Sequence, residues 1–164
     1  MDFKFRTTGL SRVHITDLAQ YIKAYVAEYR QEPFSLWVGC DSLPKDAGWA
    51  EFGIAIVLYR YGKGAHIVGT MTREYHRDDF KRLSREVEII IEMATYFRDT
   101  GTFELPNIVE YDMHLDFNKE KEFKSNEMYD WAIGWVRGCG FPCTPKPEAY
   151  AASYAADKIV RREL

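Results

Sequence analysis

Five segments of the chain carry the apolar patterns of β-strands. Residues 32–40 ("EPFSLWVGC") are apolar almost throughout, which is typical of a strand buried on both faces. Residues 50–75 predict two strands joined around the turn Gly62-Lys63-Gly64. Residues 141–147 predict a short extended stretch. Residues 106–118 alternate in polarity and predict a strand with one apolar face, formed by Val109, Tyr111, Met113, Leu115 and Phe117.

Four other segments have the apolar spacing of helices. They are residues 16–29, 78–98, 125–137 and 147–164. Thr16 or Asp17 can cap the first helix, and Pro147 suits the first turn of the last one. The second helix has the clearest apolar stripe, made of Leu83, Val87, Ile90, Ala94 and Phe97. The order α, β-β-β, α, β, α, β, α predicts an α/β fold with a mixed sheet flanked by helices.

Length and composition favour one globular domain. With 164 residues, 46% of them hydrophobic, the chain can bury a core of its own, so general disorder is excluded. We expect a single domain over residues 1–164, with residues 1–32 as an N-terminal helical extension. The net charge of −3 argues against a protein that coats nucleic acid, so a polyanion would have to meet a local basic patch or metal ions.

The cysteines and the chain's hydropathy predict a cytoplasmic protein. Cys40, Cys139 and Cys143 are odd in number and match no common zinc spacing, which favours reduced thiols. The first residues are charged and show no signal peptide. No apolar run approaches the roughly 20 residues of a membrane-spanning helix, so no membrane partner is expected.

Two acidic residues are expected close to the predicted sheet, one at the end of its first strand and one on the second helix. Asp41 directly follows residues 32–40, and ligands of α/β sheets gather at the carboxyl ends of strands. An Asx or Ser turn formed by Asp41 and Ser42 would explain the same residues. Glu86 borders the apolar stripe of its helix, so its carboxylate points toward the sheet, where a cation has to meet it. Arg82 or Arg85 could be that cation.

Two further acidic residues lie on later elements. Asp116 is near the end of the strand 106–118 and shares its polar face with Asp112 and His114. His114 could bind a transition metal together with either aspartate, or could simply be hydrogen-bonded. Asp157 lies on the last helix beside Ser153, at the edge of a stripe of small residues formed by Ala149, Ala152 and Ala156, and could also be an ordinary boundary residue.

Together these four acidic residues predict a metal site. Asp41, Glu86, Asp116 and Asp157 lie on elements that can converge on one point of the sheet. Crowded carboxylates repel one another unless divalent cations neutralise them, and oxygen ligands suit Mg²⁺ or Mn²⁺. Two such ions about 4 Å apart support in-line phosphoryl chemistry.

Several stretches in order resemble a known family. They are "VGCDS", "RLSREVE", "HLDFN", "KSN", "GWVRGCGF" and "KPEAYAASYAAD", and they span residues 37–158. They resemble the YkuK-type family of bacterial and phage proteins, which is grouped with ribonuclease H-like folds. That resemblance implies a five-stranded mixed sheet with helices on both sides and, by analogy with the superfamily, enzymes that cut or join nucleic acids with two metal ions.

The resemblance implies the same four acidic residues by position. Asp41 matches the aspartate of the first strand, Glu86 the helix glutamate, Asp116 the aspartate of the fourth strand and Asp157 the acid of the C-terminal helix. Leu43 departs from the family pattern, which usually has a polar residue there. That difference puts a substrate contact in this loop in doubt but leaves the metal site intact.

Four polar residues are candidates for substrate binding. Ser42 adjoins Asp41, and Lys146 precedes the last helix, from which it could meet a scissile phosphate or remain solvated. Lys124 and Asn126 open the predicted helix 125–137, whose N-terminus offers free N–H groups to a phosphate. Ser125 or Asn126 could instead cap that helix.

A basic stripe is the best candidate for contact with a nucleic-acid backbone. Arg77, Lys81 and Arg85 share one helical face, although neighbouring acidic residues dilute it, so a solvated helix face stays an alternative. The four tryptophans are expected in or near the core: Trp37, Trp49, Trp131 and Trp135.

The sequence thus predicts a two-metal phosphodiester hydrolase that acts on RNA or DNA. Two alternatives stay open. A catalytically inactive module of the same fold could bind nucleic acid or protein partners, and its Glu86 or Asp157 would be turned away and paired with arginine. A hydrolase of small phosphorylated molecules would fit the acidic composition and would have a closed pocket.

Overall fold

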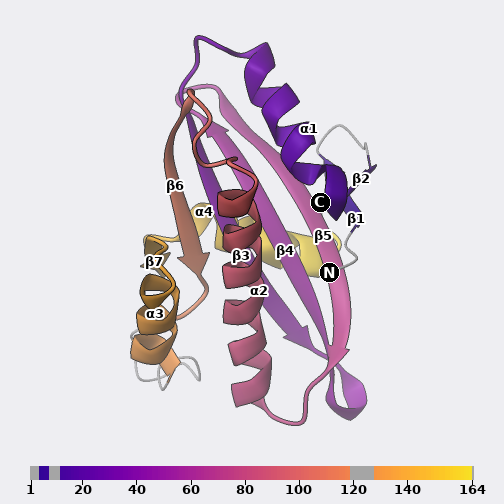
Figure 1. The fold of residues 1–164 in the computed structure, drawn as a ribbon. Helices are drawn as coiled ribbons and strands as arrows, with labels where there is room; N and C mark the ends of the chain where they lie inside the picture. The colour runs from indigo at the N-terminus through magenta and orange to yellow at the C-terminus, as the bar shows by residue number, and fades with distance from the viewer. Residues whose placement is uncertain (1–3, 8–11, 119–127, 164) are drawn as a thin grey trace.

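All strands of the described chain join one mixed sheet. The computed structural model describes residues 4–7, 12–118 and 128–163. The seven strands lie in the order β2-β1-β5-β4-β3-β6-β7 (Figure 1). They are β1 (Lys4–Thr7), β2 (Arg12–His14), β3 (Phe34–Pro44), β4 (Trp49–Arg60), β5 (Gly64–Tyr75), β6 (Ile108–Leu115) and β7 (Cys143–Pro145). The mixed α/β architecture is confirmed, and the sheet has seven strands instead of the five expected, because the N-terminal β1 and β2 extend it beyond β5.

Helices cover both faces of this sheet. They are α1 (Ile15–Glu28), α2 (Asp79–Asp99), α3 (Tyr129–Gly138) and α4 (Tyr150–Val160), and a 3₁₀ turn, η1 (Asp46–Gly48), joins β3 to β4. In Figure 1, α2 lies in front of the central strands and α4 crosses behind them. In the described parts of the chain, no helix is long and apolar enough to cross a membrane.

The core on the α2 side is large and combines aliphatic and phenylalanine side chains. All five residues of the stripe predicted for this helix are buried there: Leu83, Val87, Ile90, Ala94 and Phe97. On the α4 side, small residues bring the helix onto the sheet. A Cβ atom added at Gly39 would lie 2.7 Å from the backbone of Ala152, and one at Gly53 would lie 2.3 Å from the carbonyl oxygen of Ala156. The alanine stripe predicted for the last helix therefore packs directly against glycines of β3 and β4.

The first central strand is longer than predicted. We expected it to end at Cys40, but β3 continues to Pro44. Its pairing with β6 does stop at the pair Cys40–Leu115, while its pairing with β4 continues to Pro44–Ala50. Asp41 therefore follows the end of the parallel pairing and not the end of the strand.

Helix boundaries differ from prediction by a few residues. His14 caps α1, accepting a hydrogen bond from the backbone N–H of Thr16, where Thr16 or Asp17 was expected. The last helix begins at Tyr150 and not at Pro147. The segment 119–127, which holds the predicted start of the third helix, lies outside the described residues.

Three side chains lie in surroundings that the sequence did not predict. Val109 is 61% exposed because the register between β3 and β6 shifts beside it and breaks the alternation expected for that strand. Trp49 and Trp131 are each 41% exposed and do not belong to the core.

Candidate functional site

Three of the four predicted acidic residues line one pocket. Asp41 of β3, Asp116 just beyond β6 and Asp157 of α4 surround a cavity of about 380 Å³. Lys146 and Ser153 also line it. The convergence predicted from spacing is therefore observed for Asp41, Asp116 and Asp157.

The parallel pairing of β3 and β6 explains how two of them meet. The last paired residues are Cys40 and Leu115, so Asp41 and Asp116 are the next residues along two adjacent parallel strands. Alternation places both on the side of the sheet covered by α4, the side that Gly39 and His114 also face. The close approach of α4 then brings Asp157 to the same point.

The pocket concentrates negative charge. The pKa of Asp41 is raised from 3.8 to about 7, mainly by burial and then by the charges of Asp116 and Asp157. A hydrogen bond shared with Asp116 raises it further, while the backbone N–H of Ser42, 2.8 Å from Oδ1, lowers it. Near neutral pH the group therefore holds or releases a proton according to the charge placed beside it.

Two basic side chains partly offset this charge. The ammonium of Lys146 forms an ion pair with Asp116 Oδ1, although no described donor makes a well-directed hydrogen bond to that oxygen. Arg161 Nε donates to Asp157 Oδ1 at 2.5 Å. Lys146 thus lies at the predicted place beside the acidic residues, whereas sequence reasoning missed Arg161, one helical turn after Asp157.

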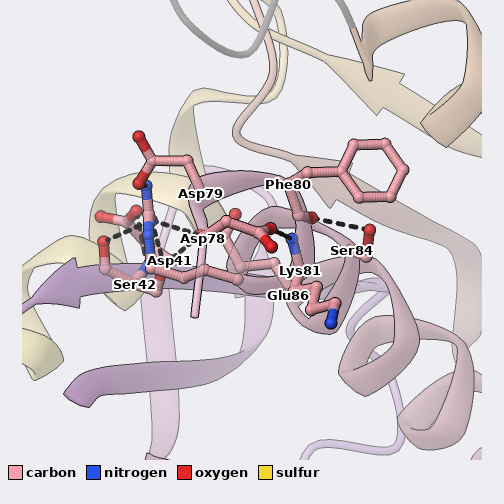
Figure 2. Close-up of polar contacts among 9 residues, drawn as sticks. Asp41, Ser42, Asp78, Asp79, Phe80, Lys81, Ser84 and Glu86 are labelled. Atoms are coloured by element: carbon pink, nitrogen blue, oxygen red, sulfur yellow. Dashed lines mark hydrogen bonds and ion pairs between the residues drawn. The ribbon is translucent and has the colours of Figure 1, made fainter. Parts of the chain in front are cut away.

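Glu86 lies on the other side of β3. Its buried carboxylate accepts a hydrogen bond from Ser42 Oγ and forms an ion pair with Arg82 Nη1 at 3.4 Å (Figure 2). Of the two arginines considered as its partner, Arg82 is the one observed; Arg85 pairs with Glu74, Glu88 and Glu92. Burial and the charge of Asp41 raise the pKa of Glu86 well above its usual value, so the two carboxyl groups still influence each other.

Arg82 links this network to the start of α2. Its guanidinium donates to Ser42 Oγ and Asp79 Oδ1, and Asp78 caps the helix by accepting from the backbone N–H of Lys81 at 2.8 Å (Figure 2). Ser42, a predicted substrate contact, is 8% exposed and already has two side-chain partners. Its hydroxyl holds the sheet and the helix together.

His114 is a buried packing residue. Its ring stacks on Trp37 with centroids 5.2 Å apart, and its Nδ1 accepts from the backbone N–H of Ala152. Burial lowers its pKa to about 4, so the ring is neutral near pH 7. Asp112 accepts a hydrogen bond from Thr144, 2.5 Å away. These contacts support the hydrogen-bonded alternative for His114.

The donor set of the pocket suits a divalent cation, although its present arrangement is not a ready-made cage. Asp41, Asp116 and Asp157 offer only oxygen atoms, which Mg²⁺ and Mn²⁺ prefer. Among the described residues, no three His, Cys, Asp or Glu side chains are already grouped closely enough to hold an ion. An ion would have to draw the aspartates together and replace Lys146 and Arg161 as their counter-charge.

One pocket residue gave no signal in the sequence. Ser153 is 1% exposed, and its Oγ has no hydrogen-bond partner among the described residues. The sequence places it beside Asp157 on the last helix but does not show that its hydroxyl is buried. Lys124 and Asn126, two predicted substrate contacts, lie outside the described residues.

The predicted basic stripe is not a continuous cationic surface. Arg77 and Lys81 are exposed, but Arg85 contacts three glutamates on its own helix and on β5. Its side chain is therefore held within the protein's own charge network and is not available to a phosphate.

Comparison with known proteins places the chain in a family. Residues 17–161 match the family described as "Ribonuclease H-like". No match was found among curated proteins or among solved structures. The family match extends over most of the chain and agrees with the mixed sheet, while the narrower YkuK-type resemblance stays a prediction. The chain belongs to the ribonuclease H-like family.

Proposed function

We propose that the protein is a divalent-metal-dependent phosphodiester hydrolase that acts on nucleic acid. The observation that carries this proposal is the meeting of Asp41, Asp116 and Asp157 in one pocket, where burial and then the charges of the other two aspartates raise the pKa of Asp41 to about 7. Crowding three acidic residues at one half-buried point costs stability, because each negative charge disfavours the ionisation of the others. Binding of Mg²⁺ or Mn²⁺ would remove that cost.

Each residue has a place in this proposal. Asp41 and Asp116 would hold the ions, and Asp157 would add a third carboxylate if it left Arg161. Glu86 is the candidate fourth ligand, and Arg82 would have to move for it to reach an ion. Two bound ions supply an activated water and neutralise the leaving oxygen. Lys146, freed from Asp116, can then contact the scissile phosphate.

A nuclease panel tests this proposal. Single-stranded, duplex and hybrid oligonucleotides are incubated with the purified protein and Mg²⁺, Mn²⁺ or EDTA, beside the variant Asp41→Asn. Cleavage that needs a metal and is lost in the variant supports the proposal. Equal cleavage by both proteins contradicts it, as does cleavage of small phosphate esters, assayed in parallel, without cleavage of any oligonucleotide.

A second candidate is a binding module without catalysis. It is favoured by the ion pairs Arg82–Glu86 and Arg161–Asp157, which satisfy two of the four predicted ligands with arginine. Metal titration separates the two functions. A hydrolase binds Mg²⁺ or Mn²⁺ through Asp41, so heat evolved on titration disappears in Asp41→Asn. A binding module retains nucleic-acid affinity and shows no such metal signal.

A further inference from the structure

A second surface lies on the same face of the sheet as the acidic pocket. It consists of Trp49, Arg73 and Tyr75, which we call the aromatic platform. Trp49 is 41% exposed and Tyr75 is 55% exposed. The platform lies at the tip of the β3–β4 hairpin and the end of β5, in the lower right of Figure 1.

The strand register shows that platform and pocket share one face. Asp41 pairs with Gly53, and Gly53 pairs with Met71, so these three residues face the same side of the sheet, the side of α4. Residues two and four positions nearer the hairpin tip face that side too, because side chains alternate along a strand. Those residues include the pairs Glu51–Arg73 and Trp49–Tyr75. Trp49 is four positions before Gly53, which places the platform about 13 Å from the level of Asp41 along the strand.

The rings of the platform are held in place. A Cβ atom at Gly48 would lie 2.7 Å from Cε2 of Tyr75, so this ring lies directly on the glycine backbone. Trp49 and Tyr75 meet edge to face with centroids 5.9 Å apart, and the Arg73 guanidinium lies 5.1 Å from the Trp49 ring. The backbone N–H of His76 also donates to the carbonyl of Gly48 at 2.8 Å. A ligand that stacks here has few side chains to immobilise.

Basic groups lie on and beside the platform. Arg73 is exposed, and among the described residues it has no carboxylate partner. Between the platform and the pocket, Glu51 is bound by both Lys45 and Arg162, which leaves a net positive charge there. Exposed aromatic rings next to cations are the features with which proteins bind single-stranded nucleic acids.

We propose that the aromatic platform stacks unpaired bases of a single-stranded nucleic acid whose backbone continues to the acidic pocket. This inference rests on the proposed function and narrows its substrate to strands that are unpaired about four nucleotides from the cleaved bond, at about 3.4 Å per stacked nucleotide. A continuous duplex keeps its base faces stacked on one another and offers none to Trp49 or Tyr75. RNA and DNA both have such faces, so the platform by itself accepts either.

Binding measurements in EDTA test the platform apart from catalysis. Fluorescence anisotropy with labelled 12-nucleotide single strands of DNA and RNA, and with the corresponding duplexes, gives the Kd of wild type, Tyr75→Ala, Tyr75→Leu and Arg73→Gln. We expect wild type to prefer single strands and Tyr75→Ala to lose at least about fivefold in affinity. Tyr75→Leu, which keeps the bulk on Gly48, should still lose affinity. Arg73→Gln should reduce the salt dependence of log Kd by about 0.7.

Phe80→Ala is the matched control. Phe80 is 59% exposed, lies on α2 and packs against Trp131, away from the platform. It should bind as wild type does. Unchanged Kd values in both Tyr75 variants, an equal loss in Phe80→Ala, or equal affinity for duplexes would overturn the inference.

The same measurements with Asp41→Asn separate the two proposals. If wild type cleaves nothing with Mg²⁺ or Mn²⁺, and both wild type and Asp41→Asn bind single strands through the platform, the hydrolase is contradicted and the platform is kept. Metal-dependent cleavage that is indifferent to Tyr75→Leu keeps the hydrolase and contradicts the platform.

Discussion

Two neighbouring residues of β3 differ sharply in their surroundings. Asp41 faces α4 and lies among acidic residues whose charge is only partly offset. Ser42 faces α2 and belongs to a buried network in which the carboxylate of Glu86 meets both a hydroxyl and the Arg82 guanidinium. The strand thus separates unbalanced charge on one side from balanced charge on the other.

This difference indicates which acidic residues have functional roles. A buried charge that has a partner is explained by the fold, because the partner offsets its desolvation. A carboxylate that lies among other carboxylates, and that has no ion-pair partner among the described residues, is better explained by an absent cation. Asp41 therefore belongs to the second class, and Glu86 belongs to the first until Arg82 is displaced.

The largest expected effect is on catalysis. Asp41→Asn should lower metal-dependent cleavage by more than about 100-fold, because it removes a proposed metal ligand. Glu86→Gln keeps a hydrogen-bond acceptor for Ser42 and should cost less. Single-turnover cleavage with Mn²⁺ compares them, with Asp46→Asn as an exposed control in the same hairpin. An equal loss of cleavage activity in both variants would mean that Glu86 is also a metal ligand. It would contradict the distinction between the α4 side and the α2 side of β3.

The next effect is on stability. Arg82→Ala leaves Glu86 buried without its cation and should lower the free energy of unfolding by about 3–5 kcal/mol. The double variant Arg82→Met, Glu86→Leu removes both charges and should recover much of that loss. Urea unfolding of the single and double variants measures this coupling. If Arg82→Ala is as stable as wild type, the Arg82 guanidinium does not offset a buried charge on Glu86.

On the α4 side the stability should depend on pH and on metal. The pKa of Asp41 is about 7 in the folded protein against its ordinary value of 3.8, so the folded state binds this proton more tightly. The free energy of unfolding should therefore fall as pH rises from about 4 to about 7, by on the order of a few kcal/mol.

Thermal unfolding of Asp41→Asn checks this dependence. In EDTA at pH 8 the variant lacks the buried charge and should melt at a higher temperature than wild type. Mg²⁺ or Mn²⁺ should raise the Tm of wild type and leave that of the variant almost unchanged. A variant that melts below wild type in EDTA would show that the charge of Asp41 is well solvated or well paired.

The difference between the α4 side and the α2 side of β3 could be predicted only in part from the sequence. Helical spacing correctly placed Glu86 toward the sheet, since the phase of a long helix is set by its own apolar stripe. The spacing could not show that β3 continues past Asp41, because that extension depends on pairing with β4 alone. It also missed β1 and β2, which are only 4 and 3 residues long and carry too short a pattern to recognise.

The sequence likewise predicted which acidic residues could lie together, but it did not predict which cations pair with them. Each acidic residue could be assigned to an element, and three of them meet. Which cation reaches which carboxylate depends on side-chain directions across elements far apart in the chain, as with Lys146 and Asp116. The exposed ring of Trp49 was missed for a similar reason, because α4 crosses the strands at the level of Gly39 and Gly53 and leaves the hairpin tip uncovered.

The smallest expected effect concerns Arg161. Its pair with Asp157 is half exposed on the arginine side, so Arg161→Gln should change the free energy of unfolding by no more than about 1 kcal/mol. The same change frees Asp157 and removes a positive charge from the pocket, so metal affinity should rise severalfold. Titration calorimetry with Mn²⁺ measures it, with Arg98→Gln as a control on a distant exposed arginine. Weaker metal binding in Arg161→Gln would mean that Asp157 does not join the ions and that the arginine pair belongs to the fold, as Arg82 does on the opposite side.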